Sequence, residues 1–223
     1  MFYGWLRMIV SKTHYDKILF LDFDGTITAE ETLEGSMRRI IEPEIYREKS
    51  EEMLAGRLTL AEVLHLGFST ISSARLADIL DYVRSVPIRP GFSELLDAMS
   101  DLNIPVVVIS GGLQPYVDEK LAPYRDKLLA MHSVGLDCSG QFMRLISDYE
   151  GNGEVMQKTL IMAQYDYRYA ICAGDSYTDI NMAKSSQTVF ARDKLADMLG
   201  SQGIPFISWE DFYDIRDSIF NSR

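Results

Sequence analysis

The sequence predicts an α/β protein with a doubly wound parallel sheet and a small helical unit inserted after the first strand. Short apolar runs without alternation, such as Ile18-Leu19-Phe20-Leu21, are typical of strands buried on both faces of a parallel sheet. From residue 88 onward, such runs alternate with helical stretches, which favours right-handed crossovers within one sheet. Residues 28–87, by contrast, contain no strand-like run.

Composition limits the functions that we expect. The 223 residues, 47% hydrophobic and 11% aromatic, suffice for a globular core with one inserted unit or for two small domains. The formal net charge of -11 argues against nucleic-acid and anionic-membrane partners, which clustered Lys and Arg side chains would bind. An anionic substrate would therefore need positive charge supplied locally, by a metal ion or by a few basic side chains.

The chain carries no pattern that we associate with export or membrane insertion. Residues 1–7 lack a basic leader followed by a long apolar core and a small-residue cleavage site, and no run is long enough to span a bilayer. The two cysteines, Cys138 and Cys172, are spaced neither as a metal site nor as a disulfide framework. We therefore expect a cytoplasmic protein.

The inserted unit shows helix-start signals. Thr28 with Glu31, and Thr59 with Glu62, match the Ser/Thr-x-x-Glu capping box, and Pro43 fits the first turn of a helix. We expect residues 1–27 and 88–223 to form the core domain and residues 28–87 to form the helical one.

The remaining elements follow from the alternating pattern after Pro90-Gly91. In order, we expect a helix 92–102, a strand 106–109, a helix from about 115, a hairpin around 136 and 142, a helix 155–164, strands 169–173, 188–191 and 204–207, and a terminal helix from about 210.

Two carboxylates, Asp22 and Asp24, follow the first predicted strand. In open α/β sheets ligands bind beyond the carboxyl ends of the strands, so these two side chains should share one pocket. They repel each other unless a cation or a proton lies between them, and Mg²⁺ suits oxygen ligands that also receive a phosphate. Asp22 is the candidate nucleophile and Asp24 the candidate general acid of a phosphoryl transfer. A plain turn is the alternative.

Polar residues also follow two other predicted strands. Ser110 with Gly111 can offer a hydroxyl and backbone N–H groups to a phosphate, although most such glycine pairs are simple turns. Asp175 is placed to ligate a cation, and Asp179 either supports it or is a helix N-terminal residue, or both. Lys158 lies at the start of a predicted helix and can supply positive charge to a phosphate, although an isolated Lys is usually a solvated surface residue.

Taken in order, these motifs resemble the haloacid dehalogenase superfamily of phosphohydrolases. Asp-x-Asp-Gly-Thr, Ser, Lys and Gly-Asp-x-x-x-Asp match all of its four motifs, between about residues 17 and 191. The resemblance implies a Rossmann-like core with Mg²⁺ held by Asp22, the Asp24 backbone carbonyl and Asp175. Thr26 joins Ser110 and Gly111 as a predicted phosphate-binding residue. The second Asp of the first motif matches the phosphatase and phosphomutase branches.

A helical insertion directly after the first motif resembles the phosphoserine-phosphatase-like subgroup, in which a small helical cap closes over the site. Blocks at 22–28, 88–92, 108–112, 174–179, 190–193 and 211–216 are most similar to a bacterial branch that acts in methionine salvage. This resemblance implies a small phosphorylated metabolite as substrate. Phosphoserine is the rival, but the Arg that phosphoserine phosphatases use for the carboxylate aligns with Gly67 here, so a bidentate donor is lost.

The substrate contacts are less specific. Glu31 matches the acidic residue that holds an ammonium group in phosphoserine phosphatases, or is simply the end of the Thr28 capping box. His65 and Arg192 are further candidates, each also explained as a helix-face or surface residue. The apolar residues Met37, Met53, Leu64, Leu66 and Phe68 either line a pocket for a thioether tail or form the core of the cap. A phosphometabolite-binding sensor without catalysis is the hypothesis from a different class.

Overall fold

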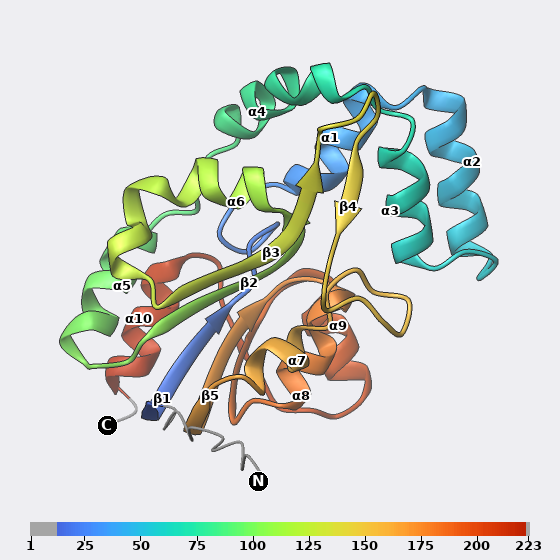
Figure 1. The fold of residues 1–223 in the computed structure, drawn as a ribbon. Coiled ribbons are helices and arrows are strands. Elements are labelled where there is room, and N and C mark those ends of the chain that lie inside the picture. Colours follow the sequence, from blue (N-terminus) through green and yellow to red (C-terminus); the bar gives the residue numbers. More distant parts are fainter. Residues whose placement is uncertain (1–12, 222–223) are drawn as a thin grey trace, which may run out of the picture.

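The computed structural model describes residues 13–221, so the reading of residues 1–7 lies outside the described part. Within it, one sheet runs through the molecule in the strand order β4-β3-β2-β1-β5-β6-β7 (Figure 1). All neighbouring strands are parallel except the pair β3 and β4. The strands are β1 (His14–Leu21), β2 (Val106–Leu113), β3 (Ala130–Asp137), β4 (Arg144–Ile146), β5 (Asp166–Gly174), β6 (Thr188–Ala191) and β7 (Ile207–Ser208).

Helices cover both faces of the sheet. The chain moves from β1 to β2 and β3 in one direction and from β5 to β6 and β7 in the other, so right-handed crossovers place the two sets of helices on opposite faces. One set is α5 (Phe92–Asp101), α6 (Gln114–Leu121) and the terminal α10 (Phe212–Asn221), which packs on α5; the other is α7 (Lys158–Met162), α8 (Ile180–Lys184) and α9 (Asp193–Ser201). The predicted α/β class is confirmed.

Strand β1 forms the centre of the core. Its second half, residues 18–21, has no exposed side chain, which explains the unbroken apolar run. It pairs with β2 on one side and β5 on the other, so the carboxyl ends of these three strands meet. Among the described residues, no helix is both long and apolar enough to cross a membrane.

The residues between β1 and α5 form four α-helices and one short 3₁₀ helix beyond one end of the sheet (Figure 1). We call residues 28–87 the cap, and this division stays a prediction. The cap helices are α1 (Thr32–Ile40), α2 (Pro43–Leu54), α3 (Leu60–Phe68) and α4 (Leu76–Ser85). The segments leading into and out of the cap pair with each other through an antiparallel bridge between Thr28 and Ile88.

Three short 3₁₀ helices complete the description, and one hairpin reaches the cap. They are η1 (Ser73–Arg75), η2 (Ala122–Lys127) and η3 (Tyr177–Asp179). The predicted hairpin is confirmed as β3 and β4, and its connection bridges to the cap between Ser72 and Phe142. Its second strand begins at Arg144, after the predicted Phe142, and β3 is longer than the sequence pattern indicated.

One of the two predicted capping boxes is wrong. Thr59 and Glu62 form the reciprocal hydrogen bonds at the start of α3, as predicted. Helix α1 instead begins at Thr32, with Glu31 at the N-cap and no side-chain cap. The Thr28 hydroxyl accepts a hydrogen bond from the Gly25 N–H (3.1 Å) and so closes the loop that follows β1.

Candidate active site

The site begins where β1 and β5 end. Leu21 pairs with Ala173 in register, and the Asp22 N–H donates to the Ala173 carbonyl at 3.1 Å. Asp22 and Asp175, the residues that follow the two paired ends, therefore emerge side by side at the carboxyl edge of the sheet. Both are buried, with 4% and 6% of their surface exposed.

Lys158 connects two of the acids. It is the first residue of α7, is 2% exposed, and donates to Oδ1 of Asp22 and, at 2.5 Å, to Oδ1 of Asp179. Burial opposes the charge of Lys158, but Asp179 and Asp22 outweigh it and raise its pKa. Burial and the charge of Asp179 raise the pKa of Asp22, against the opposing effect of Lys158.

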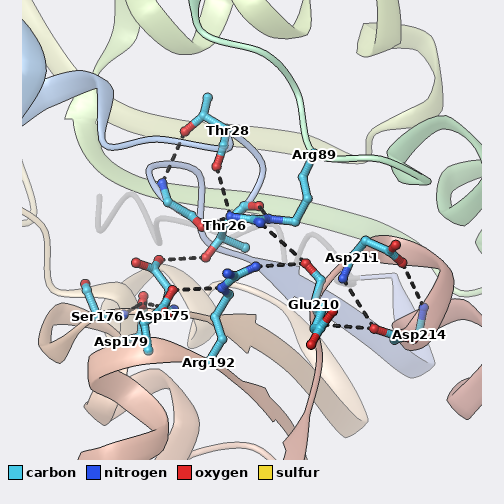
Figure 2. A network of polar contacts seen from close by, with 12 residues as sticks. Thr26, Thr28, Arg89, Asp175, Ser176, Asp179, Arg192, Glu210, Asp211 and Asp214 are labelled. Atoms are coloured by element: carbon cyan, nitrogen blue, oxygen red, sulfur yellow. Dashed lines mark hydrogen bonds and ion pairs between the residues drawn. The ribbon is translucent and has the colours of Figure 1, made fainter.

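Asp179 is a helix-start residue that also contacts the backbone of Asp175. Besides the ion pair with Lys158, its Oδ2 accepts the N–H groups of Asp175 (3.1 Å) and Ser176 (3.0 Å) and so caps the short helix η3. A helix-start acid thus fixes the backbone that carries Asp175. Figure 2 shows the Asp175 and Asp179 side chains close together beside Ser176.

Asp24 is held by the cap. Its Oδ1 accepts the backbone N–H of Thr32 at 2.8 Å and also the Thr32 hydroxyl, at the first residue of α1. A Cβ on Gly112 would overlap Oδ2 of Asp24, so only glycine allows this close approach. Burial raises the pKa of Asp24, and the hydrogen bonds from Thr32 oppose the rise. The start of the cap and the end of β2 together place this carboxyl group.

The loop after Asp24 supports Asp175. The Thr26 hydroxyl donates to Oδ1 of Asp175 at 2.9 Å (Figure 2). Gly25 has a φ of +76° and lies so close to Asp175 that a Cβ would overlap its carboxylate. Burial, reinforced by Asp179, raises the pKa of Asp175 to about 7. Thr26 therefore contacts an acid in this structure and does not form part of the cavity wall described below.

The residues at the carboxyl end of β2 divide into two kinds. Ser110 is fully buried, and its hydroxyl accepts the N–H of Gly112 at 2.9 Å. Gly111 and Gly112 line the cavity next to the acids, whereas Ser110 does not. The serine thus shapes the turn, and the glycines present their backbone to the pocket.

The donor set fits a divalent cation. Carboxylate oxygens of Asp22, Asp175 and Asp179 lie within 4.8 Å of one another. Lys158 contacts two of these three acids but brings only one positive charge, and Asp175 receives a hydroxyl and no cationic side chain among the described residues. Hard oxygen ligands with excess negative charge in a buried site are the chemistry that Mg²⁺ prefers.

A cavity of about 530 Å³ extends from these acids into the cap. One end is polar and is lined by Asp22, Asp24, Gly111, Gly112 and Lys158. The rest of the lining is largely apolar and includes Leu33, Met37, Met53, Leu54, Leu60, Val63, Leu64, Val155 and Met156. Polar cap residues line it as well, namely Glu31, Glu34, Arg38, Tyr46 and Ser50. Of the predicted apolar lining residues, Leu66 and Phe68 are absent from this wall. The size suits a small metabolite.

Glu31 is the predicted substrate contact that does line the cavity. Its carboxyl group makes no hydrogen bond within residues 13–221, and burial, with repulsion from Asp24, raises its pKa to about 8. His65 instead hydrogen-bonds the Glu150 carboxylate (2.8 Å), and Arg192 donates to the Glu210 carbonyl (2.8 Å). The structure does not bring these two side chains to the cavity.

Sequence reasoning missed two residues that shape the site. Thr32 anchors Asp24, but its position at the start of α1 depends on where the preceding loop ends. Arg89 donates to carbonyls of the loop after Asp24. The sequence signal that could have indicated Arg89 is its position in Ile-Arg-Pro-Gly, where the chain returns from the cap to the sheet.

The fold and the site define a class of protein. A model of the haloacid dehalogenase-like hydrolase family matches residues 19–184, which include all the acids described above. The chain belongs to this family, and the predicted family and enzyme class are confirmed.

Comparison with individual proteins is more specific. A curated relative from Microcystis aeruginosa, named 2-hydroxy-3-keto-5-methylthiopentenyl-1-phosphate phosphatase, is 40% identical over 203 residues, which are 90% of this chain and 96% of the relative. One of the same name from Brevibacillus brevis is 31% identical and covers 89% and 92%. A phosphoserine phosphatase structure with a phospho-aspartyl intermediate analogue has a TM-score of 0.70 at 16% identity, covers 92% and 99%, and shares the fold.

Proposed function

We propose that this chain is a Mg²⁺-dependent phosphomonoesterase that acts through an aspartyl-phosphate at Asp22. The observation that carries this proposal is the buried contact between Lys158 and the Asp22 carboxylate at one end of a cavity that also contains Asp24. A carboxylate held in a fixed orientation beside a cationic side chain is suited to in-line attack on phosphorus.

In the first step, an Asp22 oxygen forms a bond to phosphorus while the ester oxygen leaves. Asp24 donates a proton to that leaving oxygen, so an alcohol or enol departs. Lys158 keeps Asp22 oriented and adds positive charge near the phosphoryl oxygens. The backbone of Gly111 lines the same end of the cavity, and its N–H group would serve as a further donor, whereas the Gly112 N–H is bound to the Ser110 hydroxyl.

In the second step, water replaces the aspartyl ester. Asp24, now a carboxylate, takes a proton from the water, whose oxygen bonds to phosphorus as the bond to Asp22 breaks. Inorganic phosphate is released and Asp22 is regenerated. Asp22, Asp175 and the Asp24 backbone carbonyl would hold the ion, with Asp179 close by; bound Mg²⁺ would supply charge neutralisation for the phosphoryl oxygens.

We further propose 2-hydroxy-3-keto-5-methylthiopentenyl-1-phosphate as the substrate. The names of both relatives support it, and so does the apolar wall formed by Met37, Leu60 and Leu64, which suits an uncharged methylthio tail. A small-molecule phosphate monoester in the cytoplasm, with no nucleic-acid or membrane partner, remains the prediction.

Phosphoserine is the weaker candidate. Gly67, which aligns with the carboxylate-binding Arg of phosphoserine phosphatases, does not line the cavity. A Cβ there would lie 2.9 Å from Met37 Cε and 3.0 Å from Ile41 Cδ1, so the position is packed inside the cap. Glu31 would receive an ammonium group. Arg38 and Lys194 also line the cavity, but Arg38 is paired with Glu34 (2.5 Å) and Lys194 lies over the Tyr177 ring, so neither takes the place of that Arg.

The direct test is Asp22→Asn assayed with p-nitrophenyl phosphate and Mg²⁺. The isosteric amide cannot act as the nucleophile, so turnover should fall to background while the circular dichroism spectrum stays that of the wild type. Substantial residual turnover would rule out the aspartyl-phosphate route. A wild-type protein that hydrolyses no member of a broad phosphate panel would instead support the binding sensor.

A further inference from the structure

The two segments that enter and leave the cap are joined directly below the site. The Ala29 N–H donates to the Pro87 carbonyl and the Arg89 N–H donates to the Ile27 carbonyl, both at 2.9 Å. Together with the bridge between Thr28 and Ile88, they form a short antiparallel ladder. Arg89 is therefore fixed by its backbone next to the loop that follows Asp24.

The Arg89 side chain then turns back onto that loop. Its guanidinium donates to the carbonyls of Gly25 (2.6 Å), Thr26 (3.0 Å) and Thr28 (3.5 Å). Figure 2 shows it lying across the loop on the side opposite Asp175. The same loop supports Asp175 from its other side, through the Thr26 hydroxyl and the close approach of Gly25. One side chain thus holds the element that orients a predicted metal ligand.

Arg89 is anchored from behind by the segment that precedes α10. Its guanidinium lies 5.4 Å from the ring centroid of Trp209 and donates to the Glu210 carbonyl at 3.4 Å. Arg192 lies over the same ring at 5.2 Å and donates to the same carbonyl at 2.8 Å. The two arginines therefore share their support, but only Arg89 reaches the loop.

The partners of Arg89 indicate a geometric role. Within residues 13–221 it forms no ion pair, and its side-chain hydrogen bonds go to backbone carbonyls. A planar guanidinium can donate to several carbonyls at fixed angles, whereas a lysine ammonium is a point charge on a flexible stem. A half-buried cation with no carboxylate partner is costly, so its retention is best explained by the loop that it fixes.

We infer that Arg89 is a positioning residue: it holds the loop 25–28 and thereby keeps the Asp175 carboxylate placed for cation binding and catalysis. This inference rests on the proposed function. Asp175 has few other restraints on its side chain, because within residues 13–221 its carboxylate accepts a side-chain hydrogen bond from Thr26 in that loop alone. Loss of the guanidinium should therefore loosen the metal ligand before it disturbs the rest of the fold.

The test compares Arg89→Met and Arg89→Lys with the matched control Arg192→Met in the full-length protein. Mg²⁺ dissociation constants are measured by calorimetry with MgCl₂ alone, and kcat and KM are measured at saturating Mg²⁺. Residues that orient metal ligands typically contribute 10–100-fold, so Arg89→Met should weaken Mg²⁺ binding and lower kcat by about tenfold or more. KM should change much less, and Arg89→Lys should restore only part of the loss.

The control variant Arg192→Met distinguishes an effect on the loop 25–28 from an effect on the packing around Trp209. Arg192→Met removes a guanidinium from the same indole ring and the same Glu210 carbonyl, so it should leave the Mg²⁺ affinity close to that of the wild type. Equal losses in the Arg89 and Arg192 variants would assign the effect to packing around Trp209 and overturn the inference. Wild-type Mg²⁺ affinity and kcat in Arg89→Met would also overturn it.

Two further readouts keep the result interpretable. Thermal denaturation reports whether Arg89→Met is folded at the assay temperature. If it is not, Arg89→Lys, which keeps the charge and most of the stem, is compared with the wild type and with Arg192→Met by its Mg²⁺ affinity and kcat instead. Because Mg²⁺ binding is measured without substrate, the inference can be judged even if the wild-type protein hydrolyses no phosphate ester. That last outcome would contradict the proposed function alone.

Discussion

The two ends of the cavity are built differently. At the sheet, each acid is fixed by named partners: Asp179 by Lys158 and two N–H groups, and Asp24 by Thr32. In the cap, most lining side chains on α1, α2 and α3 are apolar, the lining Arg38 is paired with Glu34, and Glu31 makes no hydrogen bond within residues 13–221. This difference indicates separate tasks for the two ends. The hydrogen-bonded acids at the sheet are suited to phosphoryl transfer, and the apolar side chains of the cap are suited to selecting the leaving group by its shape.

Among the substitutions that distinguish the two ends of the cavity, Asp24→Asn should cause the largest loss of turnover. A general acid contributes on the order of 10²–10⁴-fold, and the loss should fall on esters whose leaving oxygen needs a proton. p-Nitrophenolate departs without one, so this variant should still release a burst of nitrophenol in single-turnover experiments. The amide oxygen can keep the contact with the Thr32 N–H, so the fold should be preserved.

The same experiment can contradict the role of Asp24. If the burst is lost to the same extent as turnover of alkyl phosphates, Asp24 acts mainly by holding the start of α1 in place. The measurement is rapid-quench kinetics with p-nitrophenyl phosphate and an alkyl phosphate at matched saturation.

A smaller effect should come from the cap wall. Leu33→Asn places an amide in the apolar wall and should lower kcat/KM for the methylthiopentenyl phosphate by about tenfold, the scale of a small change in an apolar pocket. Glycerol phosphate, whose leaving group is polar, should lose much less.

Leu66→Asn is the matched control for this substitution. Leu66 is on α3 in the same cap but is 43% exposed and lies outside the cavity wall. It should leave the ratio of the two kcat/KM values unchanged. If the ratio of the two kcat/KM values changed similarly in both variants, the apolar wall would not be what discriminates between leaving groups.

The smallest effect should be one of stability alone. Thr59→Ala removes the capping box of α3 and should lower the free energy of unfolding by about 1 kcal/mol. Because Thr59 lies outside the cavity, kcat should stay that of the wild type. Thermal denaturation is the measurement, with Ser69→Ala at the other end of α3 as a milder control. A large fall in kcat in Thr59→Ala would show that the catalytic rate depends on the stability of the cap.

The core site was predictable because strand ends are visible in a sequence. Asp22, Asp24 and Asp175 follow apolar runs, and a parallel sheet brings the ends of neighbouring strands together. Lys158 was identified through its place in the order of motifs, and its complete burial between two acids could not be read from its neighbours in the sequence.

The cap and the loop were less predictable because their contacts are not set by a strand pattern. Thr28 matches a capping box but bonds within its own loop instead, since α1 starts four residues later. Leu64 and Leu66 look alike in the sequence, yet the turn of α3 points one to the cavity and the other to solvent. Arg89 contacts residues more than sixty positions away.

The most direct test of this division between core and cap is a comparison of kcat/KM for 2-hydroxy-3-keto-5-methylthiopentenyl-1-phosphate, phosphoserine and a panel of small sugar and alcohol phosphates. A largely apolar cap wall, in which the guanidinium of Arg38 is already paired with Glu34, should make the methylthiopentenyl ester the best substrate and phosphoserine a poor one. If phosphoserine is instead the best substrate by a wide margin, the account of the cap wall is wrong, although the assignment of the acids in the core would stand.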